Sequence, residues 1–234
     1  MSSAAVPTLN RAIGFYEAPI GKKVAMAITG AILFGFVVVH MIDNLSIYSS
    51  NSDQINRLAA FLHDPEMAPL LWAARIVLLA SVVLHIVAAF QLWNMNRAAR
   101  PVGYRKKNDV PNAYAARTMV WSGPIILAFV IFHILHLTTG SVLPLQEFGP
   151  NQPNVRANVI QGFQHPAVAI FYILAMLLLC LHLYHGVWSM FQSVGVNHPR
   201  YTLWLKRFAM VSALLIAIGN TSIPVAALAG WLTY

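Results

Sequence analysis

Five long apolar segments are the feature that most constrains the fold of this chain. They cover about residues 24–45, 69–92, 118–143, 166–191 and 208–232. Each is close to the roughly 20 residues that a helix needs to cross the hydrocarbon core of a bilayer. None shows the strict alternation of apolar and polar residues that predicts membrane strands. We therefore predict an all-α integral membrane protein, a bundle of five transmembrane helices forming a single domain over residues 1–234.

The positions of the basic residues predict the orientation of this bundle. Twelve of the 15 Lys and Arg residues lie before the first segment, between the second and third, or between the fourth and fifth. The other side holds only Arg57, Arg75 and Arg156. The positive-inside rule then predicts a cytoplasmic N-terminus and a C-terminus outside, in the cell inner (cytoplasmic) membrane. Because these charges sit in short loops beside membrane segments, the net charge of +8 does not indicate a nucleic-acid partner.

Histidine occurs inside four of the five apolar segments. An imidazole in hydrocarbon has lost its water, so each ring needs a polar partner or a metal there. A bis-histidine haem takes two imidazoles from opposite sides of a macrocycle, and helix bundles present such ligands in their interior. One ligand from each of four helices predicts two haems, but spacing alone does not choose within the two H-x-x-H pairs. The histidines are His40, His85, His133 with His136, and His182 with His185.

Other metal chemistries fit the sequence less well. Di-iron bundles combine glutamates with Glu-x-x-His motifs, and none of the five segments contains glutamate. A zinc site needs all its ligands to converge on one point, whereas these histidines lie at different depths. Cys180 is the single cysteine, which excludes an internal disulfide and an all-cysteine cluster. A histidine-lined transporter is a further alternative, and it should show intramembrane carboxylates, broken helices or inverted repeats.

Several motifs around these histidines resemble one known family. They are "KKVAMAITG" leading to "VVVHMIDNL", "VVLHIVAAF" followed by "NRAARPVGY", "FVIFHILHL", and "LHLYHGVWSMFQSVG". Over nearly the whole chain they resemble the cytochrome b subunit of succinate dehydrogenase and fumarate reductase, of the five-helix, diheme, single-subunit type. The resemblance implies a membrane anchor that relays electrons between an iron–sulfur subunit and a membrane quinone, with menaquinone favoured.

The resemblance also implies the partners and the enzyme. A flavoprotein subunit and the iron–sulfur subunit would dock on the cytoplasmic face to form a succinate:quinone oxidoreductase, and the whole complex can form an oligomer. The chain has no flavin or nucleotide fingerprint such as G-x-G-x-x-G, so we expect it to carry haem and quinone sites but no dicarboxylate chemistry. The alternative is a diheme quinol-oxidising anchor of another respiratory complex, of the formate dehydrogenase or hydrogenase type.

Laid on this sequence, the family pattern implies haem ligands at His40, His85, His133 and His182. A rise of about 1.5 Å per residue puts His40 and His133 roughly 8 and 15 Å below the outer helix ends, and His85 and His182 each roughly 24 Å below them. Axial ligands of one haem must share a depth. We therefore predict that His40 pairs with His133 on an outer, distal haem, and that His85 pairs with His182 on an inner, proximal haem.

Four further residues are weaker candidates. Arg75 near the outer end of the second segment either neutralises a haem propionate or extends its charge to the interface. His136 and His185, as non-ligands in the family pattern, would hydrogen-bond a propionate, a backbone carbonyl or quinone. Glu66 in an outer loop is the candidate for proton transfer at a quinone site beside the distal haem, against the simpler interpretation as a solvated acidic loop.

Overall fold

The computed structural model describes residues 14, 16–51, 54–99, 111–143 and 154–233, without the side chains of 111–116. Within these ranges the chain forms helices and no strand. The long helices are α2 (Pro19–Leu45), α4 (Ala68–Ala98), α5 (Pro111–His133), α7 (Pro166–Ser193) and α8 (Pro199–Leu228). The short elements are η1 (Ser46–Tyr48), α3 (Gln54–Leu62), the π turn η2 (Ile134–Thr138) and α6 (Val155–Phe163).

Five stretches are long and apolar enough to cross a membrane. They are Pro19–Tyr48, Ala68–Ala98, Arg117–Thr138, Pro166–Ser193 and Pro199–Leu228. Many large apolar side chains on them point outward, among them Trp72, Leu79 and Ile218. Such a surface suits lipid, and an α-helix pairs most of its backbone polar groups within itself. The predictions of an all-α fold and of a multi-pass membrane protein are confirmed.

Several observed helices extend beyond or stop short of the predicted segments, and at the third and fifth segments a glycine or a proline marks the observed helix end. The third segment was expected to reach Leu143, but the helix ends at Thr138, just before Gly140 adopts a φ of +65°. The fifth segment begins at Pro199, nine residues before the apolar run, because proline is favoured in the first helical turn. It ends at Leu228, where Gly230 has a φ of +70°.

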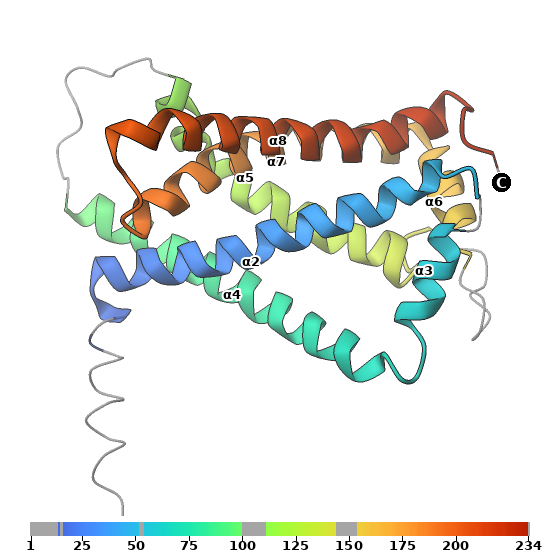
Figure 1. Cartoon of the computed structure of the whole chain (residues 1–234), viewed down its shortest axis with the longest axis horizontal. Helices are drawn as coiled ribbons and strands as arrows, with labels where there is room; N and C mark the ends of the chain where they lie inside the picture. The colour runs from blue at the N-terminus through green and yellow to red at the C-terminus, as the bar shows by residue number, and fades with distance from the viewer. Residues whose placement is uncertain (1–13, 15, 52–53, 100–110, 144–153, 234) are drawn as a thin grey trace, which may run out of the picture.

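The long helices form two pairs, α2 with α4 and α5 with α7, which are joined by the α2–α7 contact and by α8. Helix α4 packs against α2, and α5 packs against α7, while α2 and α7 pack against each other and against α8. In the described part of the chain, neither α2 and α5 nor α4 and α7 are among the closely packed helix pairs. Figure 1 shows α4 diverging from α2 along its length, with α3 near the open end of the angle.

The two ends of the bundle differ in their packing. We call the end with α3, α6 and the C-terminus the α6 end, and the end where α2 and α8 begin the N-terminal end (Figure 1). The largest buried apolar cluster lies at the α6 end and includes Ile160, Phe163 and Tyr172. Toward the N-terminal end, buried alanines on α8 such as Ala209 and Ala213 let this helix lie close to its neighbours.

At the α6 end, Arg156 of α6 forms hydrogen bonds with η1, α3 and the C-terminal segment. Its Nη1 donates to the carbonyl of Ile47 at 2.7 Å and its Nε donates to the carbonyl of Thr233 at 3.1 Å. Its backbone N–H donates to the side-chain oxygen of Asn56 at 3.0 Å. These carbonyls belong to η1 and to the C-terminal segment, so one guanidinium satisfies helix-end acceptors that are far apart in the sequence.

We expect Arg156→Gln to lower the stability of the protein in detergent by about 1–3 kcal/mol, because two charge-assisted hydrogen bonds are lost. Thermal unfolding followed by circular dichroism measures this loss. The matched control is Lys23→Gln, since Lys23 is an exposed cation on α2. Equal melting temperatures for the two variants would contradict the role of Arg156.

Candidate functional site

The structure brings four of the predicted histidines together as two pairs. The rings of His40 on α2 and His133 on α5 have centroids 5.7 Å apart, with planes at 85°. The rings of His85 on α4 and His182 on α7 have centroids 6.4 Å apart, with planes at 54°. These are the pairs that helix depth predicted, and all four side chains are half-buried. Each pair bridges two helices that do not pack closely.

The geometry of both pairs suits one metal ion between two imidazoles. Two imidazoles that bind opposite sides of one ion at about 2 Å have ring centroids roughly 6 Å apart. There is also open space on α7 one helical turn after His182, where a Cβ built on Gly186 meets no atom within 4 Å. The residues present therefore fit a haem with two histidine ligands, and ligation itself stays a prediction.

Among the residues that the structure describes, no group of three or more His, Cys, Asp or Glu side chains could hold a metal ion. A haem iron needs only two axial ligands, because the macrocycle supplies the other four. Each histidine pair supplies two.

The hydrogen bond of His85 determines which of its ring nitrogens is free. Thr29 Oγ1 donates to the carbonyl of Ala25 at 2.8 Å and lies 3.2 Å from His85 Nδ1. A hydroxyl has one hydrogen, so with that hydrogen on the carbonyl, Nδ1 of His85 is the donor to Thr29. Its Nε2 then keeps the lone pair that a metal needs. A Cβ built on Gly30 would lie 3.4 Å from His85 Cε1, in van der Waals contact, so this glycine lies directly against the ring.

A second hydroxyl lies beside His182. Ser122 Oγ on α5 is 3.4 Å from His182 Nδ1, and the Ser122 side chain is buried. In both rings of the His85–His182 pair, the nitrogen nearer the backbone thus faces an alcohol on a neighbouring helix. This arrangement orients both rings. It leaves Nε2 of His85 for a ligand, and it does the same for His182 when Nδ1 of that ring carries the hydrogen.

His133 and His136 share one partner but have different surroundings. The hydroxyl of Tyr172 on α7 lies 3.2 Å from His133 Nδ1 and 2.9 Å from His136 Nδ1. His136 is completely buried, and a Cβ built on Gly162 of α6 would lie 2.5 Å from its Nε2. A macrocycle has no room there, whereas the half-buried His133 faces His40. The packing therefore distinguishes the two histidines that spacing could not separate.

A local change in the helix contributes to this difference. The π turn η2 begins directly after His133 and contains His136. A π turn closes its hydrogen bond over one more residue than an α turn, so side chains three residues apart diverge by a larger angle. His136 consequently points to α6 while His133 points to α2.

His185, Arg75 and Glu66 lie outside the two pairs. His185 is half-buried, and among the described residues it makes neither a hydrogen bond nor a ring contact. The guanidinium of Arg75 lies 5.0 Å from the ring centre of Trp72 on the same helix. Glu66 is exposed in the turn between α3 and α4, where its backbone N–H donates to Asp64 Oδ1 at 2.8 Å. Their roles toward haem, propionate and quinone stay predictions.

Sequence reasoning missed the residues that hold the histidine rings, namely Thr29, Ser122, Tyr172 and Gly162. Serine and threonine inside apolar helices commonly bond to their own backbone, as Thr29 also does. A tyrosine in such a segment carries no signal of its own, and neither does Gly162, which lies between two of the apolar segments. Only the neighbouring helix shows which ring each of them contacts.

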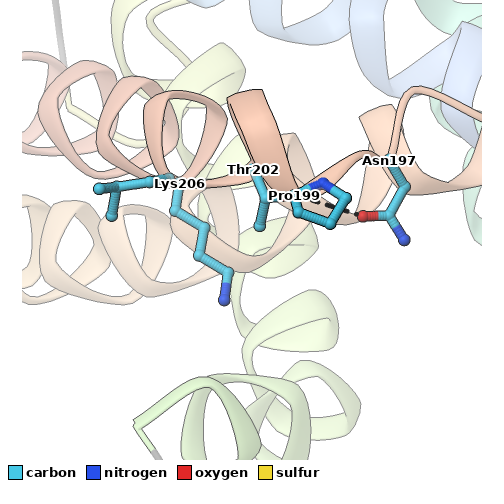
Figure 2. A pocket seen from close by; sticks show the side chains of 5 residues that line it. Asn197, Pro199, Thr202 and Lys206 are labelled. Carbon is cyan, nitrogen blue, oxygen red and sulfur yellow. Dashed lines mark hydrogen bonds between the residues drawn. The ribbon is translucent and has the colours of Figure 1, made fainter.

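A separate open pocket lies at the start of α8, at the N-terminal end (Figure 2). It is lined by Asn197, Pro199, Thr202, Leu203 and Lys206. The Thr202 hydroxyl donates to Asn197 Oδ1 at 3.4 Å. None of the eight predicted site residues lines this pocket.

Comparisons of the chain with protein-family models, curated proteins and solved structures gave no match. The family resemblance of the motifs therefore stays a prediction. The candidate site rests on the geometry of the two histidine pairs.

The contact between His136 and Gly162 can be tested by itself. We expect Gly162→Ala to lower stability by about 1–3 kcal/mol, because the added methyl group would overlap the imidazole and force it to move. The matched control is Gly35→Ala on α2, where a Cβ meets nothing within 4 Å and alanine favours the helix. Thermal unfolding of both variants in detergent measures the difference. A Gly162→Ala protein as stable as the control would show that α6 does not confine His136.

Proposed function

We propose that this chain is the diheme cytochrome b membrane anchor of a succinate:quinone oxidoreductase. The observation that carries the proposal is the presence of two interhelical histidine pairs at two levels of an apolar bundle, with ring centroids 5.7 Å and 6.4 Å apart. Bis-histidine haem uses such a pair, and two stacked pairs suit a relay across a core about 30 Å thick.

The residues of this chain would bind and orient the haems. His40 and His133 hold one haem b, and His85 and His182 hold the other, each through Nε2. Haem b supplies one-electron transfer when bound. The hydroxyls beside His85, His133 and His182 orient the imidazoles, and the apolar helices exclude water from both levels.

The charge distribution supports the orientation in this proposal. Lys22 and Lys23 begin α2, Arg97 ends α4, and Lys206 and Arg207 lie in the first turns of α8, so they gather at the N-terminal end. That end is then cytoplasmic in the inner membrane, where the flavoprotein and iron–sulfur subunits would dock.

The distance of each histidine pair from the cytoplasmic face decides whether it holds the proximal or the distal haem. The His85–His182 pair lies nearer the N-terminal end and is the proximal pair. The His40–His133 pair lies nearer the α6 end, on the outer side, where menaquinone chemistry would use Glu66 for proton transfer.

Purification of the intact complex from membranes tests the proposal. We expect a reduced-minus-oxidised spectrum with two b-type haems per chain, co-purification of a flavoprotein and an iron–sulfur subunit, and quinone in the lipid extract. A chain free of haem would overturn the proposal in favour of a histidine-lined transporter. Two haems together with a molybdenum or nickel subunit would assign the chain to a formate dehydrogenase or hydrogenase type of complex.

A further inference from the structure

The hydroxyl of Tyr172 lies between two histidines of the third span. It contacts Nδ1 of His133 at 3.2 Å and Nδ1 of His136 at 2.9 Å. The phenol ring is 5% exposed and meets the rings of Phe129 and Phe163 edge-on, at centroid distances of 5.0 and 4.8 Å. These contacts pack the ring, so its position in the core keeps the hydroxyl beside both histidines.

The number of hydrogens on the Tyr172 hydroxyl limits which of the two histidines it can donate to. A phenol has one hydrogen to donate, so it cannot donate to both Nδ1 atoms. Nε2 of His133 can bind a metal only if its ring is neutral and carries its hydrogen on Nδ1. The Tyr172 oxygen then accepts from His133, which leaves its O–H for Nδ1 of His136, whose Nε2 is buried without a hydrogen-bond partner among the described residues. Gly162 packs against the Nε2 side of His136, so this ring is fixed in place and holds the Tyr172 hydroxyl through Nδ1.

We propose that Tyr172, anchored by His136, is the positioning residue of His133 and lowers the reduction potential of the haem that His40 and His133 hold. This inference rests on the proposed function. An acceptor on Nδ1–H makes an imidazole a stronger electron donor, which stabilises oxidised iron. A chain of two hydrogen bonds strengthens that acceptor. The other pair has single alcohols, Thr29 and Ser122, in the same position.

The test is a redox titration of the purified complex carrying Tyr172→Phe, which removes the hydroxyl and keeps the ring. We expect one haem to rise in midpoint potential by about 59 mV, which corresponds to a tenfold change in the one-electron equilibrium. The low-spin ferric resonance of that haem should shift, while the second haem keeps its potential. His136→Ala should raise the potential of the same haem by a smaller amount, and this variant retains the Tyr172 contact to His133.

The control is Thr29→Val, which removes the corresponding hydroxyl at the other pair. We expect it to shift the second haem and to leave the first unchanged. With both haems bound, the inference is overturned if neither Tyr172→Phe nor His136→Ala moves a potential, or if Tyr172→Phe and Thr29→Val move the same haem. Absence of haem from the wild-type complex would instead refute the proposed function itself.

Discussion

Replacement of His85 or His182 with alanine is expected to remove one haem b, and replacement of His40 or His133 is expected to remove the other. The physical reason is that both axial bonds of one haem end on one iron, so loss of either imidazole breaks the same site. The 6.4 Å and 5.7 Å ring separations define which residues act together. Each variant should retain about half of the haem of the wild type, as expected when one of two bis-histidine sites is lost.

Haem content per chain and a redox-resolved difference spectrum measure this result. A matched control is His63→Ala, because His63 is an exposed histidine in the turn after α3 and bonds to the carbonyl of Ala59. It should retain both haems. The assignment fails if His40→Ala and His85→Ala abolish one shared component while the other persists in both.

His136→Ala is expected to keep both haems and to lose stability instead. The side chain is completely buried between α6 and α7, so its removal leaves a cavity and an unpaired Tyr172 hydroxyl donor. Together these changes cost about 2–4 kcal/mol. Thermal unfolding and haem content, measured on the same preparation, separate this outcome from that of His133→Ala.

His185→Ala provides the comparison within the other H-x-x-H pair. His185 is half-buried without a described hydrogen bond, so we expect both haems and a smaller loss of stability than for His136→Ala. If either His136→Ala or His185→Ala removed a haem, the ligand of that pair would be the second histidine and not the first.

The number and location of the helices were predicted correctly, because apolar composition determines them. Some helix ends were predicted wrongly, because backbone geometry determines those. Hydropathy located all five spans, because the thickness of the bilayer sets the length of an apolar segment. It did not locate the ends at Thr138 and Pro199, which follow from Gly140 and from the preference of proline for a first helical turn. It also contained no sign of the π turn after His133.

The level of each histidine could be worked out from the sequence alone, since helix rise converts residue number into depth without reference to any neighbour. The sequence therefore predicted the five helices. It also predicted that His40 lies at a similar depth to His133, and His85 at a similar depth to His182. Only the tertiary structure decided that His136 packs against Gly162 while His133 faces His40, and that the Tyr172 hydroxyl joins the two. Those contacts depend on the rotation of each helix about its axis, and residues on other helices, distant in the sequence, set that rotation by packing.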